Sequence, residues 1–202
     1  MKRVTNGSLL VLLAFVLVGA IASAASAEEF IYSHTGKLKS KPLGIQTFTL
    51  ESGLAIECKE ATSEGEATSL KATTLGISIL YGKCTAFSGS DEATVSLANY
   101  RFGTSPRSLT ITAEPPLTIL ITGALKCHFI IKTPQTFSKA GEVEYKNHSG
   151  RITEESNLTG VESEVTESSE PAKCGKVGEK FKAGKFNGGQ EVELLEGTIE
   201  IA

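Results

Sequence analysis

The most regular pattern in the chain is an alternation of apolar and polar positions over residues 117–132, LTILITGALKCHFIIK. Every second residue is apolar on both sides of Gly123, and a period of two indicates β-strands with one buried face. Gly123 can adopt a positive φ, so a tight reversal there would pair the two halves as a hairpin. Cys127 belongs to the apolar phase of the second half and is predicted to lie on the buried face.

Shorter alternations of the same kind recur over residues 43–112 and 143–201, separated by Gly, Ser and Pro. No segment after residue 27 shows the 3.6-residue period of an amphipathic helix. About ten short strands rich in Thr and Ser are typical of an antiparallel β-sandwich or a jelly-roll-like barrel. The pattern therefore predicts an all-β fold in a single domain, residues 28–202.

Three segments fit this pattern less well. The polar, Thr-rich segment 61–74 predicts an edge strand or a loop. The apolar phase changes near Ala98 and Asn99, which predicts a β-bulge. Residues 166–173, TESSEPAK, are charged and poor in apolar side chains, so we expect this segment to be mobile.

Residues 1–27 have the pattern of a cleaved signal peptide: two basic residues, an apolar run over 9–21, and small residues before Glu28. The run is shorter than the ~20 residues that a membrane-spanning helix needs. The sequence therefore predicts cleavage after Ala27 and no stable membrane anchor afterwards. We expect the protein to be secreted, and to be extracellular or loosely associated with the cell envelope.

Four cysteines follow the predicted leader, and an even number in an exported chain favours disulfide bonds. Of the three possible pairings we favour Cys58 with Cys84 and Cys127 with Cys174, because each closes a local loop; loops of this size contribute roughly 3–4 kcal/mol. A zinc site needs closely spaced ligands, and the neighbours Cys127 and His128 point to opposite faces of a strand. No metal or other cofactor is expected.

The net charge of the chain argues against nucleic acid as a partner. The chain has 20 Lys and Arg against 23 Asp and Glu, and without Lys2 and Arg3 the balance is 18 against 23. A mildly acidic protein is a poor candidate for binding nucleic acid. Candidate partners are instead a cell-wall or polysaccharide surface.

Several motifs resemble a group of uncharacterised exported, β-rich proteins common in actinobacteria. They are IECKEATSEGEATS at 56–69, LYGKCTAF at 80–87, CHFIIKTPQ at 127–135, and EYKN at 144–147 followed by NLTGV at 157–161. The resemblance implies a secreted, disulfide-bonded β protein and no particular activity. Members often carry a further cysteine before an aromatic pair, but the pair Tyr100 and Phe102 has none here, so no third disulfide is implied.

Catalytic signatures are absent from the sequence. It contains no G-x-S-x-G, S-x-x-K or H-E-x-x-H. His34, His128 and His148 are scattered and are expected at the surface. Asp91 is the single aspartate, which excludes Asp-rich calcium loops.

Two functions from different classes remain. The first is a non-enzymatic binding or structural module, in which the aromatic pair Tyr100 and Phe102 is the candidate recognition surface. The alternative is a secreted, glycosidase-like hydrolase that uses two Glu carboxylates. Glu57, Glu144 and Glu193 lie in strand-like segments, although an outward-facing, solvated carboxylate explains each of them equally well.

The leader makes a direct prediction. Because small residues precede Glu28, the intact mass of the exported protein should correspond to residues 28–202. A secreted form that retains residues 1–27 would contradict both the cleavage and the compartment on which the disulfide argument depends.

Overall fold

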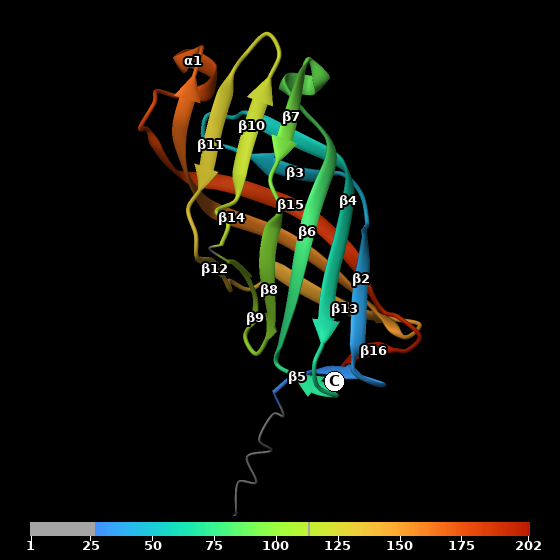
Figure 1. The fold of residues 1–202 in the computed structure, drawn as a ribbon. Coiled ribbons are helices and arrows are strands. Elements are labelled where there is room, and N and C mark those ends of the chain that lie inside the picture. Colours follow the sequence, from blue (N-terminus) through green and yellow to red (C-terminus); the bar gives the residue numbers. More distant parts are fainter. Residues whose placement is uncertain (1–26, 113) are drawn as a thin grey trace, which may run out of the picture.

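The computed structural model describes residues 27–112 and 114–202, so the predicted leader lies outside the described residues except for its last position. The described residues form a single all-β domain, with one short 3₁₀ helix and one four-residue α-helix (Figure 1). The all-β prediction is confirmed.

The elements follow one another along the chain as short and long strands. They are β1 (Phe30–Tyr32), β2 (Gly36–Pro42), β3 (Gln46–Thr49), β4 (Ala55–Ala67), β5 (Lys71–Ala72), β6 (Thr74–Ala86), η1 (Phe87–Gly89), β7 (Asp91–Val95), β8 (Ala98–Thr104), β9 (Arg107–Ile111), β10 (Thr118–Thr122), β11 (Cys127–Ile131), β12 (Gln135–Phe137), β13 (Val143–His148), β14 (Arg151–Ser168), α1 (Pro171–Cys174), β15 (Lys180–Leu194) and β16 (Ile199–Ile201).

Thirteen of these strands form one antiparallel sheet that curls into a partial ring. At one end the pairings return to their starting point, in the order β6, β7, β10, β11, β14, β15, β3, β4 and again β6. At the other end β8, β9 and β12 extend the sheet from β6, and β13 extends it from β14. At this end β12 pairs only with β9, and β13 pairs only with β14. No ladder joins β12 to β13, and we call the gap between these two strands the seam.

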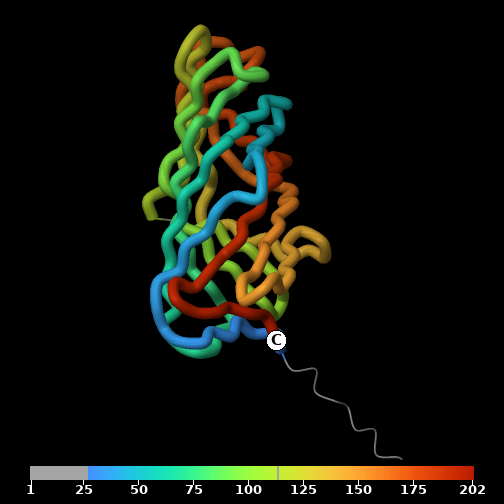
Figure 2. The backbone as a smooth tube through the Cα atoms, turned by 90° about the vertical axis from the view of Figure 1, so that its right-hand side faces the viewer, coloured from blue at the N-terminus to red at the C-terminus, as the bar shows by residue number. Residues whose placement is uncertain are grey.

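The ring is elongated, and a small second sheet lies at its lower end (Figures 1 and 2). This sheet has the order β16, β1, β5 and contains segments close to both chain termini, and we call it the terminal sheet. The observed architecture is nearer to the jelly-roll-like alternative than to the sandwich, because one continuous sheet encloses the core.

The predicted hairpin is confirmed as β10 and β11. Ile119 lies opposite Phe129 and Ile121 opposite Cys127, and these four side chains are buried in the interior. Gly123 has φ of 137° in the connecting loop, where the backbone N–H of Leu125 donates to the Asp91 carboxylate over 3.2 Å. The hairpin is thereby fixed to the start of β7.

The first half of the segment 61–74 belongs to a central strand, whereas residues 68–70 lie outside the strands and β5 (Lys71–Ala72) is an edge strand of the second sheet, so the prediction holds for the second half only. β4 continues through Ala67 and pairs with β2 on one side and β6 on the other. Its inward residues are small, and a Cβ on Gly65 would lie 2.6 Å from the Gly76 carbonyl oxygen. The prediction was wrong for residues 61–67 because their inward positions, Ala61, Ser63 and Ala67, are small or polar and give no strong apolar alternation.

Two further predictions need correction. The phase change near residue 98 is a break between β7 and β8, which pair with successive parts of β6, and not a bulge. The TESSEPAK segment is built into regular structure, since β14 continues through Ser168 and α1 begins at Pro171. The backbone N–H of Ser169 donates to the Lys126 carbonyl over 2.8 Å, which holds this segment against the hairpin loop.

The disulfides have the pairing favoured from the sequence. Cys58 and Cys84 lie opposite each other on β4 and β6, with a Cα–Cα distance of 3.9 Å. Cys127 at the start of β11 is bonded to Cys174 in α1, with a Cα–Cα distance of 6.0 Å. Two disulfides indicate folding in an oxidising environment.

The second disulfide should protect the segment that follows β14. In a Cys127→Ser, Cys174→Ser double variant we expect a loss of about 2–5 kcal/mol of stability. We also expect the first proteolytic cleavage between residues 166 and 185, because α1 has few other contacts that hold it. In the matched control, Cys58→Ser with Cys84→Ser, that segment should stay protected. First cleavage near Gly65 in the 127/174 variant would contradict this role.

Candidate functional site

A hollow of about 690 Å³ lies on the outer face of β11, β14 and β15. This volume is within the range of small-molecule and oligomer binding sites. We call it the outer groove, and its lining residues are Pro116, Ile130, Ile131, Lys132, Thr133, Glu162, Ser163, Glu164, Thr166, Lys180, Phe181 and Lys182.

Strand pairing arranges the side chains of the groove in rows across the three strands. One row runs from Ile130 on β11 through Glu164 on β14 to Lys180 on β15. In the adjacent row the Lys132 Nζ atom lies 2.6 Å from Glu162 Oε2. Across the first row the separation between Lys180 Nζ and Glu164 Oε2 is 4.0 Å. Ammonium and carboxylate groups therefore alternate across the floor of the groove, beside an apolar side chain.

The ion pair in the second row controls the charge of Glu162. The hydrogen bond from the Lys132 ammonium holds the pKa of the Glu162 carboxyl below its usual range, against a smaller opposing effect of desolvation. The charges of Lys132 and Lys182 act in the same direction as that hydrogen bond. Glu162 is therefore a carboxylate at neutral pH and can accept hydrogen bonds but not donate a proton.

The walls of the groove are fixed from both sides. The side-chain amide of Gln135 donates to the Glu162 carbonyl over 2.9 Å and accepts from the Glu162 N–H over 2.8 Å. On the opposite side Thr166 Oγ1 lies 2.8 Å from Nδ1 of His128.

Register shifts between Thr159 and Ser163 bend β14 beside the groove. The neighbouring strand β15 approaches closely here, because a Cβ on Gly184 would lie 2.6 Å from the Val161 carbonyl oxygen.

The aromatic pair predicted as a recognition surface is not exposed. Tyr100 is 4% and Phe102 3% exposed, and both side chains face the interior. The Tyr100 hydroxyl lies 2.8 Å from the Tyr81 hydroxyl. The prediction was wrong because β8 forms part of the ring wall, and its apolar phase has to fill the core.

The three carboxylates considered from the sequence are not brought together. Glu57 and Glu144 are exposed on β4 and β13. Glu193 on β15 is bound by Arg151, with a nitrogen–oxygen distance of 3.0 Å. The two glutamates of the outer groove, Glu162 and Glu164, were not singled out by the sequence. Their position depends on the pairing of β14 with β11 and β15.

The sequence reasoning also missed a cluster of polar side chains inside the ring. We call it the interior polar layer; it consists of Gln46, Tyr81, Tyr100, Glu154, Ser156 and Gln190. Most of its members surround a cavity of about 10 Å³, roughly the space of one water molecule. A signal was available, because Glu154 and Ser156 occupy the apolar phase of β14 between Ile152 and Leu158.

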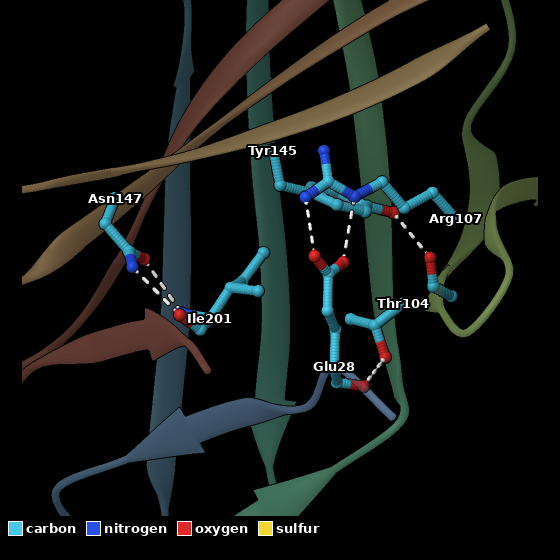
Figure 3. Close-up of polar contacts among 7 residues, drawn as sticks. Glu28, Thr104, Arg107, Tyr145, Asn147 and Ile201 are labelled. Atoms are coloured by element: carbon cyan, nitrogen blue, oxygen red, sulfur yellow. Dashed lines mark hydrogen bonds and ion pairs between the residues drawn. The ribbon is translucent and has the colours of Figure 1, made fainter. Parts of the chain in front are cut away.

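The terminal sheet is attached to the ring through side chains (Figure 3). Arg107 donates two hydrogen bonds of 2.8 Å, from Nε and from Nη2, to the Glu28 carboxylate. The Thr104 hydroxyl donates to the Glu28 carbonyl. The side chain of Asn147 pairs with the backbone N–H and carbonyl of Ile201 at 2.8 and 2.9 Å. Segments near both termini are therefore tied to the same end of the ring.

Comparisons of the chain with models of known protein families, with curated proteins and with solved structures found no match. The protein is β-rich and contains two disulfide bonds. Within the described ranges, His, Cys, Asp and Glu side chains form no group of three that could hold a metal ion. The helices of the described residues are also too short and too polar to cross a bilayer.

We call the ion pair between Arg107 and Glu28 the Arg107 clamp. Its loss should increase local opening of the terminal sheet more than it lowers the global stability of the protein. Both side chains of the ion pair are 40% exposed, so Arg107→Met should cost no more than about 1 kcal/mol. The hydrogen bond from Arg107 lowers the Glu28 pKa, so this contribution is present above the ordinary Glu range and is lost as the pH falls through the lowered pKa. Hydrogen exchange should become faster in β1 and β16.

The matched control is Lys71→Met, which removes a longer contact of 3.9 Å between Lys71 and Glu29 in the same terminal sheet. Exchange in β1 and β16 should change little in this variant. Equal acceleration in both variants would show that the clamp has no special role.

Proposed function

We propose that the protein is a secreted, non-enzymatic binding module of the extracellular space or cell envelope, and that it holds its ligand in the outer groove. The observation that carries this proposal is a preformed hollow of about 690 Å³ with an alternating polar floor. Binding sites are usually preformed concavities with a few fixed polar groups. Export is supported by the two disulfides and by the leader pattern of the sequence.

The groove is suited to a hydroxyl-rich ligand. Its lysines and glutamates already lie in pairs, such as Lys132 with Glu162 and Lys180 with Glu164, so they offer both donors and acceptors without a large net charge. Hydroxyl groups both donate and accept hydrogen bonds, and the apolar face of a sugar ring can pack against the half-exposed Ile130. We therefore propose a cell-wall or other envelope polysaccharide as the ligand.

A glycosidase-like hydrolase is the second candidate, because Glu162 and Glu164 line the same groove. Such an enzyme needs one carboxyl group that remains protonated until it donates its proton to the leaving group. The lowered pKa of Glu162 opposes that role for this residue. The groove therefore favours binding over hydrolysis.

Binding can be tested with the purified mature protein and insoluble cell-wall fractions or defined polysaccharides. Ile130→Asp places a charge on the groove floor and should weaken binding by at least about tenfold, equivalent to about 1.4 kcal/mol. The matched control is Leu80→Asp, on the outer face of β6 in a different part of the ring; Leu80 is 53% exposed. Equal binding by both variants would exclude the outer groove as the binding site.

The same samples separate binding from hydrolysis. If the protein is a binding module, incubation should release no soluble sugar, and a Glu162→Gln, Glu164→Gln double variant should change affinity only. Release of reducing ends by the wild type, lost in the double variant, would support the hydrolase instead.

A further inference from the structure

The interior polar layer contains an ionisable group without a counter-charge. Glu154 on β14 is only 4% exposed, and among the buried side chains of the described residues there is no Lys, Arg or His. The hydroxyl of Ser156 is the one side-chain donor that contacts its carboxyl group. A buried carboxylate with so little compensation is strongly disfavoured relative to the neutral acid.

The groups that face Glu154 from the neighbouring elements are neutral. They are Gln46 from β3, Tyr81 from β6, Tyr100 from β8, Tyr145 from β13 and Gln190 from β15. Glu155, which follows it on β14, would repel a second carboxylate. Arg107 and Glu28 act on Tyr145, as Glu154 does. The Arg107 guanidinium carbon lies 5.9 Å from the centre of the Tyr145 ring and is already paired with Glu28.

Glu154 also lies beside the seam, where no strand ladder joins β12 to β13. It is the direct cross-strand partner of Tyr145 on β13. The Tyr145 hydroxyl lies 3.1 Å from the Gly103 carbonyl and 3.3 Å from the Ser108 carbonyl, so it reaches across to the strands on the other side of the seam. No strand ladder joins β12 to β13, so side-chain contacts of this kind hold this part of the ring together.

We propose that Glu154 is a pH sensor built into the ring: the ring is closed while this carboxyl group is neutral, and it opens at the seam when the group ionises. Ionisation places an unpaired charge in a cavity that has room for about one water molecule, and hydration of the charge requires more water to enter. In this proposal water enters at the seam, because side-chain contacts can break there without the loss of a strand ladder.

The direction of the pH effect follows from the burial of Glu154. Desolvation raises its pKa to about 8, against a smaller lowering by the Ser156 hydrogen bond. The folded protein therefore binds a proton that the unfolded chain has released, and stability falls as the pH rises from the ordinary Glu range to about 8. Within this window the folding equilibrium constant should fall about tenfold per pH unit from this group.

The test is urea unfolding of the full mature chain as a function of pH. Relative to a Glu154→Gln variant, which keeps the size of the side chain and removes the charge, the wild type should lose about a hundredfold in folding constant between about pH 5 and about pH 7. The matched control is Glu167→Gln, an exposed glutamate on the same strand, which should follow the wild type. Equal pH dependence of the wild type and the Glu154→Gln variant would overturn the proposal.

Hydrogen exchange locates the opening. Above about pH 8, and after correction for intrinsic exchange rates, β12 and β13 of the wild type should lose protection before β10 and β11, and Glu154→Gln should abolish this difference. Tyr145→Phe removes the two hydroxyl contacts of this residue across the seam and keeps the carboxyl group, so exchange at the seam should be faster at every pH. Loss of protection in β10 and β11 first would contradict the assigned location.

A measurement on the wild type keeps the proposal testable if the Glu154→Gln variant does not fold. The infrared carbonyl band of a protonated carboxylic acid should be present at neutral pH and disappear as the pH rises through about 8. Absence of this band at neutral pH would show that Glu154 is already ionised and would exclude the sensor.

Discussion

The pairing of β14 with β15 is the interaction on which the rest of the structure depends. It extends from Ile152 opposite Val192 to Glu164 opposite Lys180, with two register shifts in between. β11 and β13 add to the other edge of β14, while β2 and β3 add to the other edge of β15. Both ends of the ring are therefore built on one antiparallel pair, and the shorter strands β2, β3, β11 and β13 are each stabilised by a ladder to one of its two long strands.

Two glutamates on opposite faces of β14 favour opposite protonation states. Glu154 faces the interior, where desolvation favours its neutral form. Glu162 faces the outer groove, where the Lys132 ammonium favours its charged form. The two residues are an even number apart and would share a face in a regular strand, but the register shifts between Thr159 and Ser163 change the phase of β14 and place them on opposite faces of the sheet. One strand thus supplies an acceptor for the proposed ligand and a buried acid that responds to pH.

The ring is closed by two different kinds of interaction. Backbone ladders close the end that contains the β10–β11 hairpin, and the Cys127–Cys174 disulfide supports this end. At the seam, contacts of Gln135 and Tyr145 with backbone groups replace a ladder. Side-chain contacts are fewer and open at lower cost than a continuous ladder. The outer groove is attached to the more rigid part of the ring, and the interior polar layer is close to the less rigid part.

The sequence by itself determined the fold class and the β10–β11 hairpin, because these depend on local alternation. Spacing along the chain favoured the observed cysteine pairing among three, and the tertiary structure decided it. Tertiary structure decided the role of β4, whose small residues give no apolar signal although it is paired on both sides. It also decided that Tyr100 and Phe102 are buried, since a strand pattern shows which residues share a face but not which face is covered. The outer groove was beyond sequence reasoning for a related reason. Lys132 follows β11, while Glu162 lies on β14 and Lys182 on β15, and only the register between those strands brings the three residues together.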